Sequence, residues 1–265
     1  MPREPSRLWT RDELIVAFNL YCQLPFGRLH QRAPEIVQLA ALLNRSPSSV
    51  AMKLVNIASL DPAITASGRS GLGNASAADR AVWAEFHADW EALALESAQI
   101  RQGLAVTHGA PDDVSATEES PADDDVLDYI GASRSGVVQV RVKQAFFRKA
   151  VLASYEGRCC ITGLSERRLL VASHIVPWAA DSNNRLNPRN GLCLSSLHDK
   201  AFDAGLLTLS ADHRVVMSAA AQSLADDAFA VSSLLNYAGQ KIRLPQKFTP
   251  DEAFLEHHRS QVFLG

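Results

Sequence analysis

The chain has 265 residues, of which 47% are hydrophobic, and its formal net charge at pH 7 is −3. A chain of this length and apolar content can bury a sizeable core and form two domains. The sequence starts without the apolar run of a signal peptide and has no later stretch long enough to span a bilayer, so we expect a soluble, cytoplasmic protein without a membrane partner.

The first domain is predicted to be helical. Thr10 and Glu13 have the spacing of a capping box, in which the side chain of each residue binds the backbone of the other. Pro and Ser at helix-start positions mark two further helices, and Ser76 is expected to cap a long fourth helix. The expected ranges are 10–22, 35–43, 46–60 and 76–100.

The first three helices resemble a helix-turn-helix unit of the Myb kind, by the pattern Trp-Thr-x-x-Glu-Leu at 9–14 and the short connection 44–46. That resemblance implies DNA contact by Lys53 and Asn56. The glycine-rich loop that contains Arg69 is a further place where the chain can approach a phosphate. Because this domain has no net positive charge, a three-helix bundle that serves packing or dimerisation is the alternative.

Charge is distributed unevenly along the chain. Residues 104–133 contain Asp and Glu but no Lys or Arg, whereas residues 134–265 have an excess of Lys and Arg. An acidic segment with few large apolar residues predicts a disordered linker, and a basic domain suits a phosphate-binding surface. We therefore expect a helical targeting, DNA-binding or assembly domain over 1–103, an acidic linker over 104–135 and a basic domain over 136–265.

The most specific pattern lies between Cys160 and Gly205. It predicts a strand that ends near His174, a loop that contains Asn190, a second short strand, and a helix that carries His198. Gly205 is expected to terminate that helix. The expected ranges, in chain order, are 168–176, 181–191, 192–194 and 197–204.

Four phrases in this stretch, ITG, ASHIVPW, NPRNGLCL and LHDKAFDAGLL, resemble the HNH endonuclease family, in the subgroup found in bacterial restriction-type nucleases. The run 140–157 resembles the helix that leads into the family's ββα-metal (His-Me finger) core. The resemblance implies an α+β protein with a C-terminal HNH nuclease domain after the N-terminal helical domain. It also implies that His174 is the general base, that Asn190 orients it, and that His198 is a metal ligand.

Phosphodiester hydrolysis needs one group to take a proton from water and another to neutralise charge on the departing oxygen. A neutral imidazole and a hard divalent cation meet these needs, so we expect a metal cofactor, Mg²⁺ first and Mn²⁺ as the alternative. Many HNH nucleases carry Asp or His immediately before the general base, whereas this chain has Ser173, a poor ligand for Mg²⁺. The second metal ligand stays open among Ser173, Asn190, Asp199 and Asp203.

The resemblance implies double-stranded DNA as substrate, products with 5′-phosphate and 3′-hydroxyl ends, and a restriction or other defence role. Arg185, Arg189 and Lys200 are candidates for phosphate contact. One HNH centre per chain favours a homodimer for cleavage of both strands, and a monomeric nickase fits as well. The alternative from another class is a non-enzymatic DNA-binding regulator with a degenerate HNH scaffold, which Ser173 favours.

The four cysteines, Cys22, Cys159, Cys160 and Cys193, do not form a disulfide framework in a chain of this size. None of them belongs to a CxxC pair, so a structural zinc is not expected. We expect them to be buried as small hydrophobic residues. No small-molecule cofactor beyond the metal is expected.

After Gly205, the sequence predicts a hairpin over 206–218, a helix over 225–237 and a final helix that starts near Pro250. The final helix carries His257 and His258. We expect it to pack onto the core, with either histidine as a metal ligand as the lesser alternative.

Overall fold

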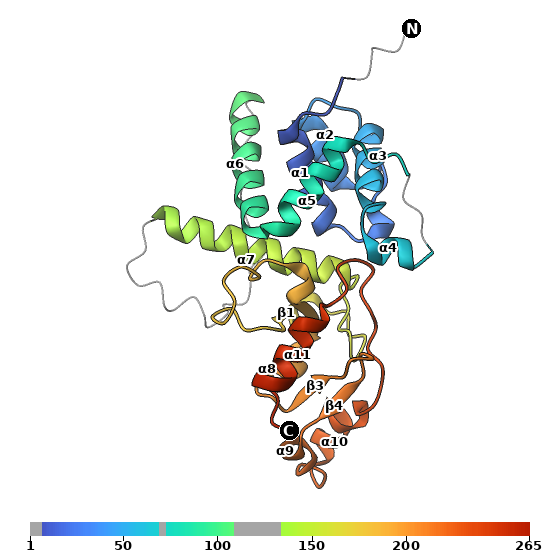
Figure 1. Cartoon of the computed structure of the whole chain (residues 1–265), viewed down its shortest axis with the longest axis vertical. Helices are drawn as coiled ribbons and strands as arrows, with labels where there is room; N and C mark the ends of the chain where they lie inside the picture. The colour runs from blue at the N-terminus through green and yellow to red at the C-terminus, as the bar shows by residue number, and fades with distance from the viewer. Residues whose placement is uncertain (1–6, 69–72, 109–133) are drawn as a thin grey trace. The chain divides into compact units, whose positions relative to one another are not determined.

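The computed structural model describes residues 7–68, 73–108 and 134–265. The chain divides into two compact units, one of Met1–Cys22 and Phe26–Lys143, the other of Gln23–Pro25 and Gln144–Gly265. The fold is a mixture of helices and two small antiparallel sheets (Figure 1), in agreement with the α+β class. Among the described residues, no helix is long and apolar enough to cross a lipid bilayer.

The described part of the first unit is helical. The backbone N–H of Thr10 donates to Glu13 Oε2 over 2.9 Å, and the N–H of Glu13 donates to Thr10 Oγ1 over 3.3 Å, which confirms the capping box. Ser46 caps the third helix by accepting the N–H of Ser49. The elements are α1 (Arg11–Gln23), η1 (Phe26–Arg28), α2 (Pro34–Leu42), α3 (Pro47–Ala58), α4 (Pro62–Ala66), α5 (Ala77–Ala88) and α6 (Trp90–His108).

The expectation of one helix over 76–100 is wrong, because the chain breaks at Asp89. This residue has φ −148° and ψ 87°, and its carboxylate accepts the N–H of Ala92 over 2.9 Å. An Asp side chain that binds a nearby backbone N–H competes with the helix and favours its terminus. The second helix, α6, then runs to His108, inside the expected linker, whose residues 109–133 lie outside the described part of the chain.

The centre of the second unit is a strand–strand–helix arrangement. Strand β1 (Leu170–His174) pairs antiparallel with β2 (Gly191–Ser195), so that Leu170 lies opposite Ser195 and His174 opposite Gly191. Helix α8 (Ser196–Asp203) follows β2 directly, with Ser195 as its N-cap, and Gly205, at φ +69°, comes just after its end. The predicted order of elements is therefore confirmed.

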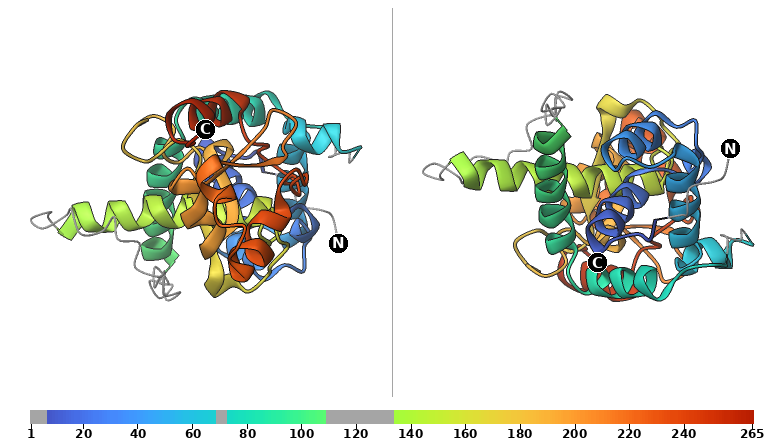
Figure 2. Two further views of the ribbon diagram at one scale, coloured as in Figure 1. Left: turned by 90° about the horizontal axis from the view of Figure 1, so that it is seen from below. Right: turned by 90° about the horizontal axis from the view of Figure 1, so that it is seen from above.

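Helix α7 (Arg134–Ser154) is continuous (Figure 2), and its C-terminal part packs closely against β2. A Cβ atom at Gly191 would lie 2.4 Å from Val151 Cγ2 and 3.0 Å from Phe147 Cζ. Phe147 and Val151 are four residues apart and share one face of the helix. Only a glycine therefore fits at position 191, directly opposite His174.

Short elements complete the second unit. They include the expected hairpin, whereas the expected helix over 225–237 is divided into α10 and η5 at Leu234, where φ is −129° and ψ −63°. The bounds are η3 (Arg167–Leu169), η4 (Pro188–Asn190), β3 (Leu207–Leu209), β4 (Val215–Met217), α9 (Ala219–Gln222), α10 (Ala228–Ser233), η5 (Leu235–Tyr237) and α11 (Glu252–Gln261).

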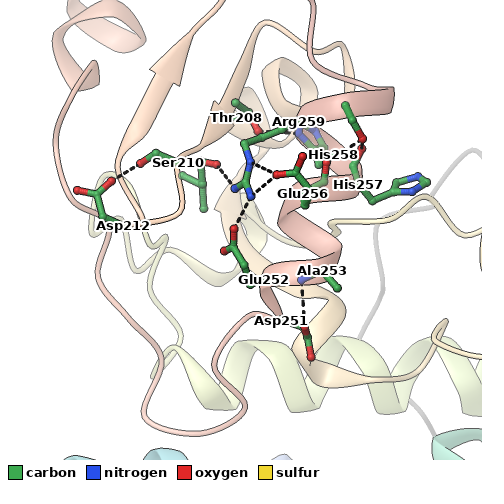
Figure 3. Close-up of polar contacts among 12 residues, drawn as sticks. Thr208, Ser210, Asp212, Asp251, Glu252, Ala253, Glu256, His257, His258 and Arg259 are labelled. Atoms are coloured by element: carbon green, nitrogen blue, oxygen red, sulfur yellow. Dashed lines mark hydrogen bonds and ion pairs between the residues drawn. The ribbon is translucent and has the colours of Figure 1, made fainter.

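The final helix, α11, packs onto the core through its two central polar residues (Figure 3). The imidazole of His258 stacks on Phe202 with ring centroids 3.6 Å apart, and its Nε2–H donates to the Phe202 carbonyl. Its Nδ1 lies 2.9 Å from Thr208 Oγ1. Arg259 donates to the Leu209 carbonyl over 2.9 Å and pairs with Glu252 and Glu256. Both ring nitrogens of His258 are occupied, which suits a neutral, structural histidine.

We expect His258 to make folding stability depend on pH. Burial lowers the pKa of His258 to about 4, with smaller opposing and reinforcing effects from the Phe202 carbonyl and from His257 and Arg259. As pH falls below about 6.5, the unfolded chain takes up a proton that the folded chain refuses, and the loss levels off near the folded pKa. The wild type should lose up to about 3 kcal/mol across this window.

Urea unfolding between pH 7.5 and 4 measures this loss. A His258→Phe variant is less stable at neutral pH, because Thr208 and Phe202 lose a partner, but it should show a smaller decline towards pH 4. His257→Gln, a change at the half-buried neighbouring histidine, is the control and should follow the wild type. Parallel declines for wild type and His258→Phe would contradict the assignment.

Candidate active site

His174 lies at the end of β1, where the hairpin holds its backbone and the following loop holds its side chain. Its Nε2–H donates to the backbone carbonyl of Arg185 over 2.8 Å. A carbonyl only accepts, so this bond fixes the proton of the neutral ring on Nε2 and leaves the lone pair on Nδ1. The tautomer is therefore suited to accept a proton at Nδ1.

Two aromatic side chains set the plane of the His174 ring. The ring of Phe147 lies parallel to it, with centroids 3.9 Å apart and planes 6° apart. Trp178 meets it edge-on, with centroids 5.5 Å apart at 85°. The sequence analysis identified neither aromatic residue as part of the site. The i, i+4 spacing of Phe147 and Val151 on the helix before the first strand was the available signal.

Asn190 fixes the loop that carries the carbonyl partner of His174. The side chain is 1% exposed; its Oδ1 accepts the N–H of Val176 over 2.8 Å, and its Nδ2 donates to the carbonyls of Val176 and Asn184, each over 3.2 Å. The amide thus joins the chain just after His174 to the chain just before Arg185. This geometry suits an orienting role, with Asn190 engaged by backbone groups.

His198 lies in the first turn of α8 and is 2% exposed. Its Nδ1 is 2.8 Å from Ser195 Oγ, and its ring meets Tyr237 edge-on at 5.3 Å. The other ring nitrogen, Nε2, is buried and has no hydrogen-bond partner among the described residues. Burial lowers the pKa of His198, which favours the neutral form that a metal requires. A buried imidazole nitrogen without a protein partner fits a metal ligand.

The other proposed ligands differ in how well they fit. Ser173 Oγ is also buried without a hydrogen-bond partner among the described residues, so it is a second polar atom in need of one. Asp199 is half-buried and Asp203 exposed. They follow the buried His198 and Phe202 by one residue each, and so lie about 100° around the helix from them. The inward-facing donors are thus one imidazole and one hydroxyl.

A cation at this position would have few protein ligands. Within the described residues, no group of three His, Cys, Asp or Glu side chains is arranged to hold a metal ion. The donor set fits a cation held by His198 Nε2, with the Ser173 hydroxyl as a weak additional ligand and water or phosphate oxygens at the remaining positions.

The predicted phosphate contacts have different surroundings. Arg185 donates from Nε to the Trp178 carbonyl over 2.8 Å, and its guanidinium lies 5.1 Å from the centre of the Trp178 ring. Arg189 pairs with Asp251 at 3.0 Å and donates to the Thr249 carbonyl, which ties its loop to the start of α11. Lys200 is exposed on α8. Of the three residues, Arg185 is held nearest to His174 by the contacts of Trp178.

The predicted DNA contacts of the first unit are less accessible. The ammonium of Lys53 is buried, 2.9 and 3.1 Å from the two carboxylate oxygens of Asp79, and lies 5.3 Å from the centre of the Trp9 ring. This ion pair joins α3 to α5, so the ammonium is not available to DNA in this structure. Asn56 is half-buried, and Arg69 lies outside the described residues.

The cysteines have the expected environment. Cys22, Cys159, Cys160 and Cys193 are all buried free thiols. Burial raises the pKa of Cys193 to about 12 and that of Cys160 well above its ordinary value. Thiols that stay protonated are poor nucleophiles and poor metal ligands.

Comparison with known proteins agrees with this geometry for one part of the chain. Residues 159–210 match the sequence profile of a family described as HNH endonuclease. No curated protein matches the chain. The matched segment contains β1, β2, α8 and the hydrogen bonds that hold His174, Asn190 and His198. An HNH endonuclease domain, which supports nuclease activity on nucleic acid, therefore occupies residues 159–210 of this protein.

Proposed function

We propose that this protein is a metal-dependent DNA endonuclease of the restriction or defence kind. The observation that carries the proposal is the position of His174 within the HNH segment, at the end of β1, with its Nε2–H fixed on the Arg185 carbonyl. An imidazole held in this tautomer takes a proton through Nδ1 from a water molecule that attacks phosphorus. The resemblance of the motif phrases to restriction-type nucleases supports the biological role.

The other residues of the site have complementary roles in the proposal. Asn190 keeps the loop in the conformation that presents the Arg185 carbonyl to His174. The Arg185 guanidinium, steadied on Trp178, binds a phosphate oxygen of the substrate. His198 holds a divalent cation, Mg²⁺ or Mn²⁺, which when bound neutralises charge on the leaving 3′ oxygen. The products have 5′-phosphate and 3′-hydroxyl ends.

Incubation of the purified protein with supercoiled plasmid tests the proposal. Mg²⁺, Mn²⁺ and EDTA are compared, with modified and unmodified DNA. We expect cleavage that EDTA abolishes, and ends that DNA ligase rejoins. Linear product formed without a nicked intermediate would support a homodimer, whereas nicked product would support a single centre acting alone.

A second candidate function is a DNA-binding regulator that does not cleave. Ser173 in place of a carboxylate or imidazole, and the small number of inward-facing ligands, favour it. Retention of DNA in a gel shift without cleavage in any metal would support this regulator and reject the nuclease.

The contact between Ser195 and His198 leads to a further prediction. Ser195 Oγ is 2.8 Å from His198 Nδ1 and so fixes the ring whose Nε2 would bind the cation. Loss of such an outer contact weakens metal affinity by about 10- to 100-fold in well-studied sites. Ser195→Ala should therefore raise the Mn²⁺ concentration for half-maximal cleavage by about that factor.

Ser196→Ala is the matched control, because the neighbouring Ser196 is exposed and donates to the Leu169 carbonyl instead. Thermal unfolding of both variants separates the metal effect from the lost helix cap, which costs about 1 kcal/mol. An unchanged metal requirement in Ser195→Ala would argue against His198 as the ligand.

A further inference from the structure

The parallel contact between Phe147 and His174 goes beyond ordinary core packing. A hydrogen bond from Nε2 to the Arg185 carbonyl fixes one atom of the imidazole but leaves the ring able to tilt about that bond. The flat face of Phe147, 3.9 Å away and 6° from parallel, removes that freedom on one side. Trp178, edge-on at 85°, limits the other direction.

The fold holds Phe147 itself firmly in place. Its side chain is 3% exposed and leaves α7 on the face that packs against β2. The Cζ atom lies 3.0 Å from where a Cβ of Gly191 would be, and Gly191 is the residue that pairs with His174. The helix, the second strand and the candidate base thus meet at one point, where a larger residue at 191 would displace the phenyl ring.

From this arrangement we infer that Phe147 is a positioning residue for the candidate base His174, acting through the plane of the imidazole. The inference rests on the proposed nuclease function and adds to it a residue outside the matched segment 159–210. A general base must point its lone pair at the attacking water, and small misplacements of a catalytic group lower rates by as much as about 100-fold. Phe147 keeps Nδ1 on that line.

Phe147→Leu and Phe146→Leu form a matched pair. Both phenylalanines are 3% exposed in the same helix, and consecutive side chains leave a helix about 100° apart. Both variants should lose stability to a similar extent. At a temperature where both are folded, Phe147→Leu should cleave saturating DNA about 10- to 100-fold more slowly than the wild type. Its DNA dissociation constant in EDTA should be unchanged, and Phe146→Leu should keep the wild-type rate.

An NMR measurement tests the positioning without relying on cleavage. Ring protons of His174 that lie over the Phe147 face should resonate upfield, and Phe147→Leu should remove that shift while Phe146→Leu keeps it. Wild-type cleavage rates in both variants, or an unchanged His174 resonance in Phe147→Leu, would overturn the inference. A wild type without cleavage in any metal would reject the nuclease function, and the resonance shift would still show whether Phe147 sets the ring.

Discussion

His174→Ala is expected to lower the rate of metal-dependent DNA cleavage by about 10²- to 10⁴-fold, the usual contribution of a general base. The side chain is half-buried at the end of β1, and its removal breaks one hydrogen bond to a loop carbonyl and one ring stack. The fold and the basic residues that contact phosphate stay in place. DNA binding in EDTA should therefore be retained while cleavage is lost.

His257→Ala is the control for this substitution, because His257 lies on α11 in the same unit and is not in the candidate site. Its cleavage rate should equal that of the wild type. Single-turnover cleavage at saturating protein, measured beside a gel shift, separates the chemical step from binding. Full activity in His174→Ala would remove His174 from the mechanism and with it the main support for the nuclease.

Asn190→Asp should damage both stability and activity although the two side chains have the same shape. In the wild type the Nδ2 group donates to the carbonyls of Val176 and Asn184. A carboxylate would place an oxygen, with its negative charge, against these two carbonyl oxygens in a site that is 1% exposed. Buried groups left without partners cost about 1–3 kcal/mol each and charged ones more, so a loss of at least about 3 kcal/mol is expected.

The loss in Asn190→Asp should depend on pH in a defined direction. Burial raises the pKa of a carboxyl group, and the protonated form can donate one of the two missing hydrogen bonds. The difference from the wild type should therefore be larger at pH 8 than at pH 5. Urea unfolding measures it, and cleavage at a temperature where the variant is folded should still be slow, because the Arg185 carbonyl is no longer held.

Asn187→Asp provides a comparison in the same loop. Asn187 also donates from Nδ2, to Asn184 Oδ1 over 3.0 Å, but it is half-buried, so water can replace the lost partner. Its stability should fall by less than about 1 kcal/mol. Equal losses in the two variants would show that the buried clamp at Asn190 is not special.

Local sequence signals predicted the positions of most elements of the candidate site. The capping box of Thr10 and Glu13, the caps at Ser46 and Ser76, and the order β1, β2, α8 were all predicted because they depend on residues close in sequence. The break at Asp89 was missed, since the apolar stripe continues through it. The roles of His174, Asn190 and His198 stay predictions that the experiments above test.

The sequence by itself determined the order of the HNH elements and the residue types at their key positions, because caps, turns and strand periodicity act over a few residues. Only the tertiary structure decided which side chains meet. It buried Lys53 against Asp79, tied Arg189 to Asp251, and placed Phe147 on the ring of His174. These contacts join residues that are far apart in the chain, and burial and packing choose among them where no local pattern does.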